Sequence, residues 1–288
     1  MIRLLLMDIG GTSVKYSRTA TPETPGELTV SRRFYNSDGS AGEILGALTG
    51  AAEGESEAVV CTPGPFDHIN GVSLMRHKFG ALYGVSLKEA FAAKGVSARF
   101  LHDSVAFMLG AAALGETKDA RRPVCITLGT GVGAAIMLDG RVPVTPLGTT
   151  AFSVYSQPFR GGTIEGSFGR SAIRRSYAEL SGCGEAPDVD EIARRAKEGE
   201  SCAAVLMREL GVSLAQALSP ILERVGCDRL ILGGGVSGAS ELFLGGLRER
   251  LSVPVTVSAH TSDAALYGCC RYYVSGDGAL ETTESSII

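Results

Sequence analysis

The order of predicted strands and helices occurs twice along this chain, and that repeat restricts the fold more than any other feature. β-branched and apolar residues cluster between Gly, Pro and Asp/Ser breaks, which predicts opening strands at Arg3–Met7, Val14–Arg18 and Leu28–Tyr35. From residue 122 the order starts again, with strands predicted at Val124–Leu128, Val132–Leu138 and Arg141–Val144. Helices and strands then alternate in each half. This pattern predicts a duplicated α/β unit with a cleft between the copies, followed by a polar tail from Ser275 that we expect to be loosely ordered.

Composition and charge restrict the class of protein. The 288 residues correspond to about two domains of roughly 150 residues each, and the shares of hydrophobic (44%) and charged (20%) residues are typical of a folded globular protein. The net charge is −4, and no basic block stands out that would bind nucleic acid or an anionic membrane. The seven cysteines include no CxxC pair, and neither a signal-peptide pattern nor an apolar run of membrane-spanning length is found. We therefore expect a cytoplasmic protein that binds neither nucleic acid nor membrane.

Glycine is enriched, at 38 of the 288 residues, and it clusters in loops that follow predicted strands. The first strand leads into Asp8-Ile9-Gly10-Gly11-Thr12-Ser13-Val14-Lys15. A glycine pair lets the backbone turn so that bare N–H groups can bind an anion, and Thr12 adds a hydroxyl donor. Asp8 could hold a hydrated Mg²⁺ beside that anion. An ordinary glycine-rich hairpin turn is the alternative interpretation.

The second half opens in the same way, with Gly129-Thr130-Gly131-Val132-Gly133 after a predicted strand. The pattern Gly129-x-Gly131-x-x-Ala134 also matches the dinucleotide fingerprint of NAD-dependent dehydrogenases, which needs a helix directly after the loop. The residues that follow predict a strand and a hairpin turn instead. Two matching Gly–Thr hairpins could grip a polyphosphate from both sides.

A third cluster, Gly233, Gly234 and Gly235, ends another predicted strand and precedes a helix. Small residues there would let a nucleobase lie against the backbone. A tight strand-to-helix turn is the alternative.

In order and spacing, these motifs resemble the ROK sugar kinases, which share a superfamily with actin and the heat-shock chaperone ATPases. The matching segments are DIGGTSVK at 8–15, CTPGPFD at 61–67, HDS at 102–104, LGTGVG at 128–133 and LGGGVS at 232–237. The resemblance implies an α/β fold of duplicated actin-like ATPase (ribonuclease H-like) domains, each with a mixed sheet flanked by helices. We expect the domains at residues 1–118 and 119–262, with a C-terminal helix in 263–288 completing the first.

The resemblance also implies the ligands and the residues that bind them. ATP phosphates would contact the two hairpins, through Asp8, Gly10, Gly11, Thr12 and Lys15 and through Gly129, Thr130, Gly131 and Gly133. Adenosine would contact Gly233, Gly234 and Gly235, and a sugar would occupy the cleft. The expected function is ATP-dependent phosphorylation of a sugar hydroxyl, with a homodimer as the candidate assembly.

Asp103 is the expected catalytic residue by the same resemblance. A sugar hydroxyl that attacks the γ-phosphoryl group must lose its proton, and a carboxylate beside it can accept that proton. Asp103 could instead cap the helix predicted from Val105, and the two roles are compatible. Sugar contacts are expected from Gly64, Pro65, His102 and Asp103, and from Glu165, whose segment Gly162-Thr163-Ile164-Glu165 resembles the family's Gly-Cys-Leu-Glu. A solvated Glu at a helix start is the alternative for Glu165.

The chain departs from the family on the sugar and zinc side. His102 stands where the family has Asn, His77-Lys78 replaces a Pro-Asn pair, and the Glu-x-Gly-His segment and the zinc-binding cysteine loop have no counterpart between Asp139 and Glu165. We therefore expect ATP and Mg²⁺ as cofactors, with Asp8 as an outer-sphere ligand of Mg²⁺, and no zinc. A degenerate protein that binds a sugar or a nucleotide without turnover is the alternative to a kinase.

Overall fold

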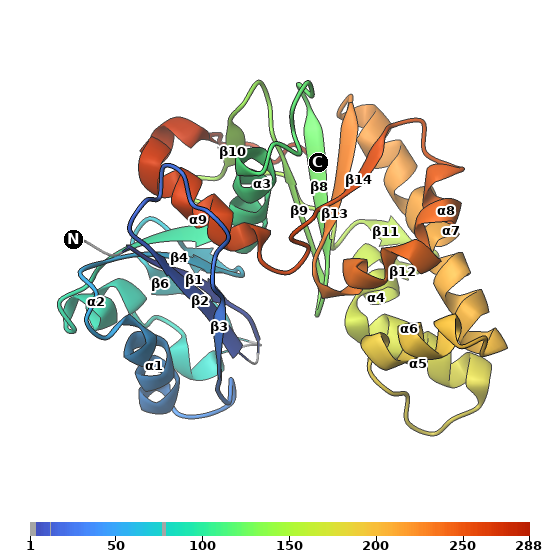
Figure 1. Ribbon diagram of the computed structural model, residues 1–288, viewed down its shortest axis with the longest axis horizontal. Helices are drawn as coiled ribbons and strands as arrows, with labels where there is room; N and C mark the ends of the chain where they lie inside the picture. The colour runs from blue at the N-terminus through green and yellow to red at the C-terminus, as the bar shows by residue number, and fades with distance from the viewer. Residues whose placement is uncertain (1–3, 12, 77–78) are drawn as a thin grey trace. The chain divides into compact units, whose positions relative to one another are not determined.

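The computed structural model describes residues 4–11, 13–76 and 79–288 (Figure 1). Contacts within the chain divide it into two compact units. Unit 1 comprises Met1–Gly115, Gly140–Ala151 and Asp263–Ser286, and unit 2 comprises Glu116–Asp139, Phe152–Ser262 and Ile287–Ile288.

Unit 1 is built on a mixed five-stranded sheet with the order β3-β2-β1-β4-β7. Its strands are β1 (Leu4–Ile9), β2 (Ser13–Thr19), β3 (Ser31–Phe34), β4 (Glu57–Thr62) and β7 (Ser97–His102). The first three strands form an antiparallel meander, and β4 and β7 run parallel to β1. Because successive side chains of a strand point to opposite faces, Leu5, Met7 and Ile9 of β1 share one core, which α1 (Ala41–Thr49) and α2 (Leu87–Ala92) also line.

Helices α3 (Asp103–Ala113) and α9 (Ala264–Ser275) pack against strands of the same sheet and closely against each other (Figure 1). Glycines make that approach possible. A Cβ on Gly110 would lie 1.8 Å from the carbonyl oxygen of Ala264, and one on Gly268 would lie 1.8 Å from that of Ala106. Helix α9 thus completes unit 1, although it begins more than 160 residues after β7, the last strand of the five-stranded sheet along the chain. Helix α3 begins directly at the end of β7.

Unit 2 contains a four-stranded mixed sheet with the order β14-β13-β8-β9. The strands are β8 (Pro123–Leu128), β9 (Val132–Ile136), β13 (Arg229–Gly233) and β14 (Val255–Val257), with β8 and β9 antiparallel and the other pairs parallel. The helices around it are α4 (Ile164–Phe168), α5 (Arg170–Ser181), α6 (Val189–Lys197), α7 (Ser201–Arg224) and α8 (Leu244–Arg248), with the 3-10 segment η3 (Gly235–Leu242).

Helix α7 is long and apolar enough to cross a membrane by length and composition, and it is the one such helix among the described residues. More than half of its apolar window is buried, and Leu206, Leu210 and Leu214 belong to the core of unit 2. Residues three and four apart lie on one face of a helix, so this stripe is typical of the core helix of a folded domain.

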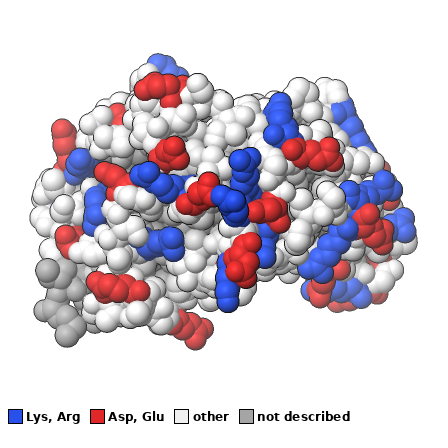
Figure 2. All heavy atoms as spheres, turned by 90° about the horizontal axis from the view of Figure 1, so that it is seen from above, with Lys and Arg blue, Asp and Glu red and all other residues white. Residues whose placement is uncertain are grey.

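The shorter elements are β5 (Phe66–Asp67), β6 (Val72–Ser73), β10 (Val142–Val144), β11 (Pro158–Phe159), β12 (Gly162–Thr163), β15 (Leu280–Thr282), η1 (Gly50–Ala52), η2 (Gly80–Leu82) and η4 (Gly276–Ala279). On the face drawn in Figure 2, Lys and Arg side chains of the described residues are interspersed with Asp and Glu rather than gathered in one extended area.

The predicted fold class is confirmed, since both units are mixed sheets flanked by helices. The strand predicted at Arg141–Val144 is confirmed as β10, but its place in the second half and the loose order of the tail are wrong. Strand β10 pairs in parallel with β15 and belongs to unit 1. The tail is therefore not loosely ordered, and the N–H of Thr283 also donates to the carbonyl oxygen of Val144 at 2.8 Å. Both errors have one cause, because a local pattern cannot reveal a strand partner more than 130 residues away.

Candidate active site

The first glycine loop is the tight turn between β1 and β2, as predicted. The N–H of Gly10 donates to the carbonyl oxygen of Ser13 at 3.0 Å, and the hydroxyl of Tyr35 donates to the carbonyl oxygen of Gly10. Gly11 lies at the tip, where a Cβ would meet no atom within 4 Å. Thr12 lies outside the described residues. The turn is held from both sides, which suits a loop whose N–H groups must keep fixed directions toward an anion.

Asp8 and Lys15 face each other across the β1–β2 ladder at the base of this turn. The thiol of Cys61 donates to Asp8 Oδ1 at 3.5 Å, and Lys15 Nζ lies 3.3 Å from Asp263 Oδ1. Burial raises the pKa of Asp8 to about 6, an effect that the positive charge of Lys15 opposes and the negative charge of Asp103 adds to. Lys15 and Asp103 therefore both act electrostatically on Asp8 at one end of the unit 1 sheet.

The groups around Asp8 are suited to Mg²⁺ that is bound partly by water and phosphate rather than by protein ligands alone. Mg²⁺ keeps several waters and takes one or two carboxylates together with substrate phosphates. Within residues 4–11, 13–76 and 79–288, no three His, Cys, Asp or Glu side chains gather as a metal site of their own. A carboxylate beside a glycine turn is suited to a cation that arrives with a nucleotide.

Asp103 is the first residue of α3, and His102 before it is the N-cap. The N–H of Ser104 donates to Asp103 Oδ1 at 2.6 Å and also approaches His102 Nδ1 at 3.3 Å. The Asp103 side chain is 41% exposed, so its carboxylate is held at its base yet open to solvent. The capping alternative is thus only partly right, because the cap is His102 and Asp103 stands inside the first turn, where the helix dipole favours a negative charge.

His102 lies beside Asp103 in a buried setting. Its Nε2 would be 3.5 Å from a Cβ on Gly64, so the missing side chain of Gly64 leaves space over the ring. Gly64 and Pro65 are joined by a cis peptide bond. Burial lowers the pKa of His102 to about 4, which makes the ring neutral near pH 7.

His68 belongs to the same cluster, and sequence reasoning missed it. Its ring centroid lies 5.5 Å from that of His102, and its side chain is buried beside Thr62. Burial lowers its pKa to about 4 as well. The residue follows the Gly64-Pro65 segment by three positions, directly after β5 (Phe66–Asp67), yet no motif marks it.

The second glycine loop joins β8 to β9 in unit 2. The N–H of Gly129 donates to the carbonyl oxygen of Gly131 at 3.0 Å, and the N–H of Arg170 donates to that of Gly129 at 2.9 Å. Gly133 pairs with Thr127 in the ladder. Since the residues after the loop form a strand rather than a helix, the dinucleotide fingerprint is excluded. Glu165, on α4, lies against this turn, and its Oε2 accepts the N–H of Val132 at 3.0 Å.

The third loop lies beside the second. Gly234 has a φ of 82°, and a Cβ there would lie 2.3 Å from the carbonyl oxygen of Leu128, so only glycine fits. Its N–H donates to the carbonyl oxygen of Thr261 at 2.7 Å. Gly233 ends β13 and Gly235 begins η3. Unit 2 therefore brings the predicted adenosine loop against the end of β8, directly before the predicted phosphate hairpin.

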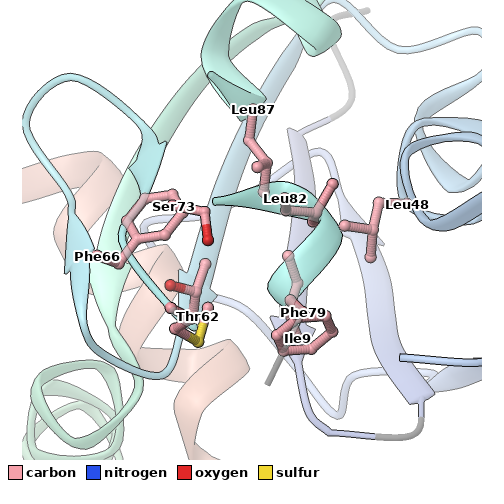
Figure 3. Close-up of a pocket in the computed structure, with 9 residues that line it drawn as sticks. Ile9, Leu48, Thr62, Phe66, Ser73, Phe79, Leu82 and Leu87 are labelled. Atoms are coloured by element: carbon pink, nitrogen blue, oxygen red, sulfur yellow. The ribbon is translucent and has the colours of Figure 1, made fainter. Parts of the chain in front are cut away.

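A small cavity of ≈ 10 Å³ lies in the core of unit 1 (Figure 3). Its walls are largely apolar, with Phe66, Leu82 and Leu87 among them, and the hydroxyl-bearing Ser73 and Thr62 line it too. This volume has room for about one water molecule and is far below the roughly 300–1,000 Å³ of ligand pockets. We therefore regard it as a packing cavity behind the Thr62–Gly64 segment rather than as a sugar site.

Two units with antiparallel hairpins around glycine turns, each continued by parallel strands, define an actin-like ATPase fold. The model of the ROK family matches residues 8–153 and 156–266, and the chain belongs to that family. The predicted resemblance is therefore confirmed.

Relatives and solved structures agree with this assignment. The chain is 26% identical to a glucokinase from Thermotoga maritima over 66% of its length and 67% of the relative's. It is 23% identical to a beta-glucoside kinase from Listeria monocytogenes over 97% of its length and all of the relative's. A ROK family glucokinase from Streptomyces griseus, solved with glucose and AMPPNP, superposes with a TM-score of 0.79 at 19% identity, covering 93% of this chain and 98% of that one.

Proposed function

We propose that this chain is a sugar kinase that transfers the γ-phosphoryl group of ATP to a sugar hydroxyl. The observation that carries the proposal is the placement of Asp103 in a chain of the ROK family: an exposed carboxylate, oriented by the N–H of Ser104, in the electrostatic neighbourhood of Asp8. The relatives named glucokinase and beta-glucoside kinase support the same activity.

Asp103 acts as the general base in this proposal. The hydrogen bond from Ser104 fixes one carboxylate oxygen, so the group can orient the attacking hydroxyl and take its proton as the bond to phosphorus forms. His102 lies beside it and Gly64 lies near the His102 ring; both are proposed to contact the sugar, together with Pro65 and Glu165.

The glycine turns are proposed to hold the nucleotide. Gly10, Gly11 and Lys15 of unit 1 and Gly129, Thr130, Gly131 and Gly133 of unit 2 would bind phosphates, and Gly233, Gly234 and Gly235 would contact adenosine. Asp8 would hold Mg²⁺ through water. When bound, Mg²⁺ supplies charge neutralisation on the phosphates; orientation and proton removal fall to the protein.

The degenerate alternative, binding without turnover, is not favoured, because Asp103 and both phosphate turns are retained in a chain whose relatives are named kinases. The sugar side is where this chain departs from the family, so a glucoside, a disaccharide or an amino sugar is proposed alongside glucose. A cytoplasmic location, no nucleic-acid or membrane partner and a homodimer complete the proposal.

A coupled assay of ADP formation over a panel of mono- and disaccharides tests this function. We expect ADP to form only when ATP, Mg²⁺ and an accepted sugar are present, with one phosphorylated sugar per ADP. Nucleotide binding without sugar-dependent ADP formation over the whole panel would instead support the degenerate alternative.

A further inference from the structure

Hydrogen bonds fix the backbone of Glu165 beside the turn between β8 and β9 in unit 2, which is the proposed phosphate-binding turn. It is the second residue of α4, whose N-cap Thr163 accepts the N–H of Gly166 at 3.0 Å. The N–H of Glu165 donates to the carbonyl oxygen of Tyr155 at 2.9 Å. With its main chain anchored on both sides, the residue presents its carboxylate in a set direction.

That carboxylate provides a side-chain hydrogen bond to the turn. Oε2 of Glu165 accepts the N–H of Val132, the first residue of β9, at 3.0 Å. The other bonds of the turn are between backbone groups, from Gly129 to Gly131 and from Arg170 to Gly129. A hydrogen bond to an ionised acceptor is roughly twice as strong as a neutral one, so Glu165 is a substantial part of what fixes this loop.

The carboxylate of Glu165 lies very close to Gly131. A Cβ on Gly131 would lie 2.2 Å from Glu165 Oε2, so a side chain there would push the carboxylate out of its present position. The φ of Gly131 is not in the left-handed region, so its backbone does not require glycine. The absence of a side chain at this position therefore serves the contact with Glu165.

We propose that Glu165 is a positioning residue of the phosphate-binding turn, which holds the N–H of Val132 so that the N–H groups of Thr130 and Gly131 keep fixed directions toward the nucleotide phosphates. The proposal rests on the proposed function, in which this turn binds ATP. This role differs from the sugar contact expected of Glu165, which would use the other carboxylate oxygen, Oε1.

Nucleotide affinity measured without sugar separates the two roles. We would titrate AMPPNP with Mg²⁺ into the wild-type protein and into Glu165→Ala, Glu165→Gln and, as a control on an exposed position of α5, Glu179→Ala. We expect Glu165→Ala to weaken AMPPNP binding about tenfold or more, since hydrogen bonds to charged groups are worth that much. Glu165→Gln keeps an acceptor oxygen for Val132 and should stay within about threefold of wild type, while its sugar KM rises. Glu179→Ala should bind AMPPNP as the wild type does.

A double-mutant cycle with Gly131→Ala tests the contact itself. Gly131→Ala should weaken AMPPNP binding because its Cβ displaces the carboxylate. In the Glu165→Ala background the same change meets no carboxylate, so it should have little further effect. Additive losses would mean that Gly131 acts independently of Glu165, which would overturn the proposal.

Hydrogen exchange of the Val132 amide gives a readout that does not need turnover. Exchange should accelerate in Glu165→Ala and stay near the wild-type rate in Glu165→Gln. If folded Glu165→Ala keeps the wild-type exchange rate or the wild-type AMPPNP affinity, the positioning role is wrong. A wild-type protein that binds no AMPPNP would contradict the proposed function instead, and the Val132 exchange rates would then decide the contact alone.

Discussion

His102 Nδ1 lies 3.2 Å from Asp103 Oδ1, and the N–H of Ser104 approaches both atoms. Because Nδ1 accepts from that N–H, the neutral ring carries its proton on Nε2, on the side of Gly64. Protonation of Nδ1 would place a cation against the proposed base and make Asp103 a weaker proton acceptor. The burial that keeps His102 neutral therefore also protects the basicity of Asp103.

Because His102 is buried and neutral, the free energy of unfolding should depend on pH, and His102→Asn should reduce that dependence. The pKa of His102 is about 4 in the folded protein and its ordinary value is 6.5, so between these values the unfolded chain binds more protons and the free energy of unfolding falls as pH falls. His68 acts in the same direction, whereas Asp8, with its raised pKa, acts in the opposite one. Urea unfolding at pH 7 and pH 5 should show a smaller loss for His102→Asn than for the wild type. An identical loss would mean that His102 is already solvated and titrates normally.

The raised pKa of Asp8 predicts that the Mg²⁺ concentration required for activity depends on pH. Its pKa is raised to about 6 by burial, so the carboxylate is charged above that pH and protonated below it. We expect the Mg²⁺ concentration for half-maximal turnover to rise steeply as pH falls from 7 to 5. In Asp8→Asn, the requirement should be high at every pH. A wild-type requirement that does not change over this interval would remove Asp8 from the cation site.

The lack of the zinc-loop cysteines predicts independence from zinc. A structural zinc site needs four Cys or His ligands, and the stretch from Asp139 to Glu165 contains neither residue. Metal analysis of the untagged protein should find far less than one zinc per chain. A zinc chelator that leaves Mg²⁺ free should change neither its thermal midpoint nor its activity, and stoichiometric zinc or unfolding on chelation would refute the prediction.

The packing of α3 on α9 predicts a sharp contrast between two glycine substitutions. A Cβ on Gly110 would lie 1.8 Å from the carbonyl oxygen of Ala264, so Gly110→Ala should destabilise unit 1 by about 1–3 kcal/mol or more. Gly46→Ala, in α1, meets no atom within 4 Å and gains up to about 1 kcal/mol of helix propensity. Urea midpoints should therefore move in opposite directions. A tolerated Gly110→Ala would show that the helices are farther apart than described.

The glycine turns and the strands around them could be predicted from sequence because their signals are local. Apolar strands that end in Gly-Gly or Gly-Thr-Gly place β1, β2, β8 and β9 correctly, and the strand after Gly133 rules out the dinucleotide fingerprint. His102 and Asp103 are likewise marked by their position between a strand and an apolar helix.

What could not be predicted depends on contacts between distant segments. The pairing of β10 with β15, the burial of His68 beside His102, and the seat of the Glu165 carboxylate at Gly131 each join residues that no shared pattern links. His68 in particular follows a turn with ordinary polar composition. Its neighbour becomes evident only once β7 and the Thr62–Asp67 segment are placed in three dimensions.

Replacement of Asp103 tests the central claim most directly. Formation of the phosphorylated sugar would be followed by mass spectrometry with ATP, Mg²⁺ and the best sugar of the panel, for the wild type and Asp103→Asn. A general base contributes about 10²–10⁴-fold, so kcat of Asp103→Asn should fall by about 10²-fold or more while sugar and AMPPNP binding persist. Equal turnover by a correctly folded Asp103→Asn protein would contradict the assignment of Asp103 as the base and, with it, the proposed mechanism.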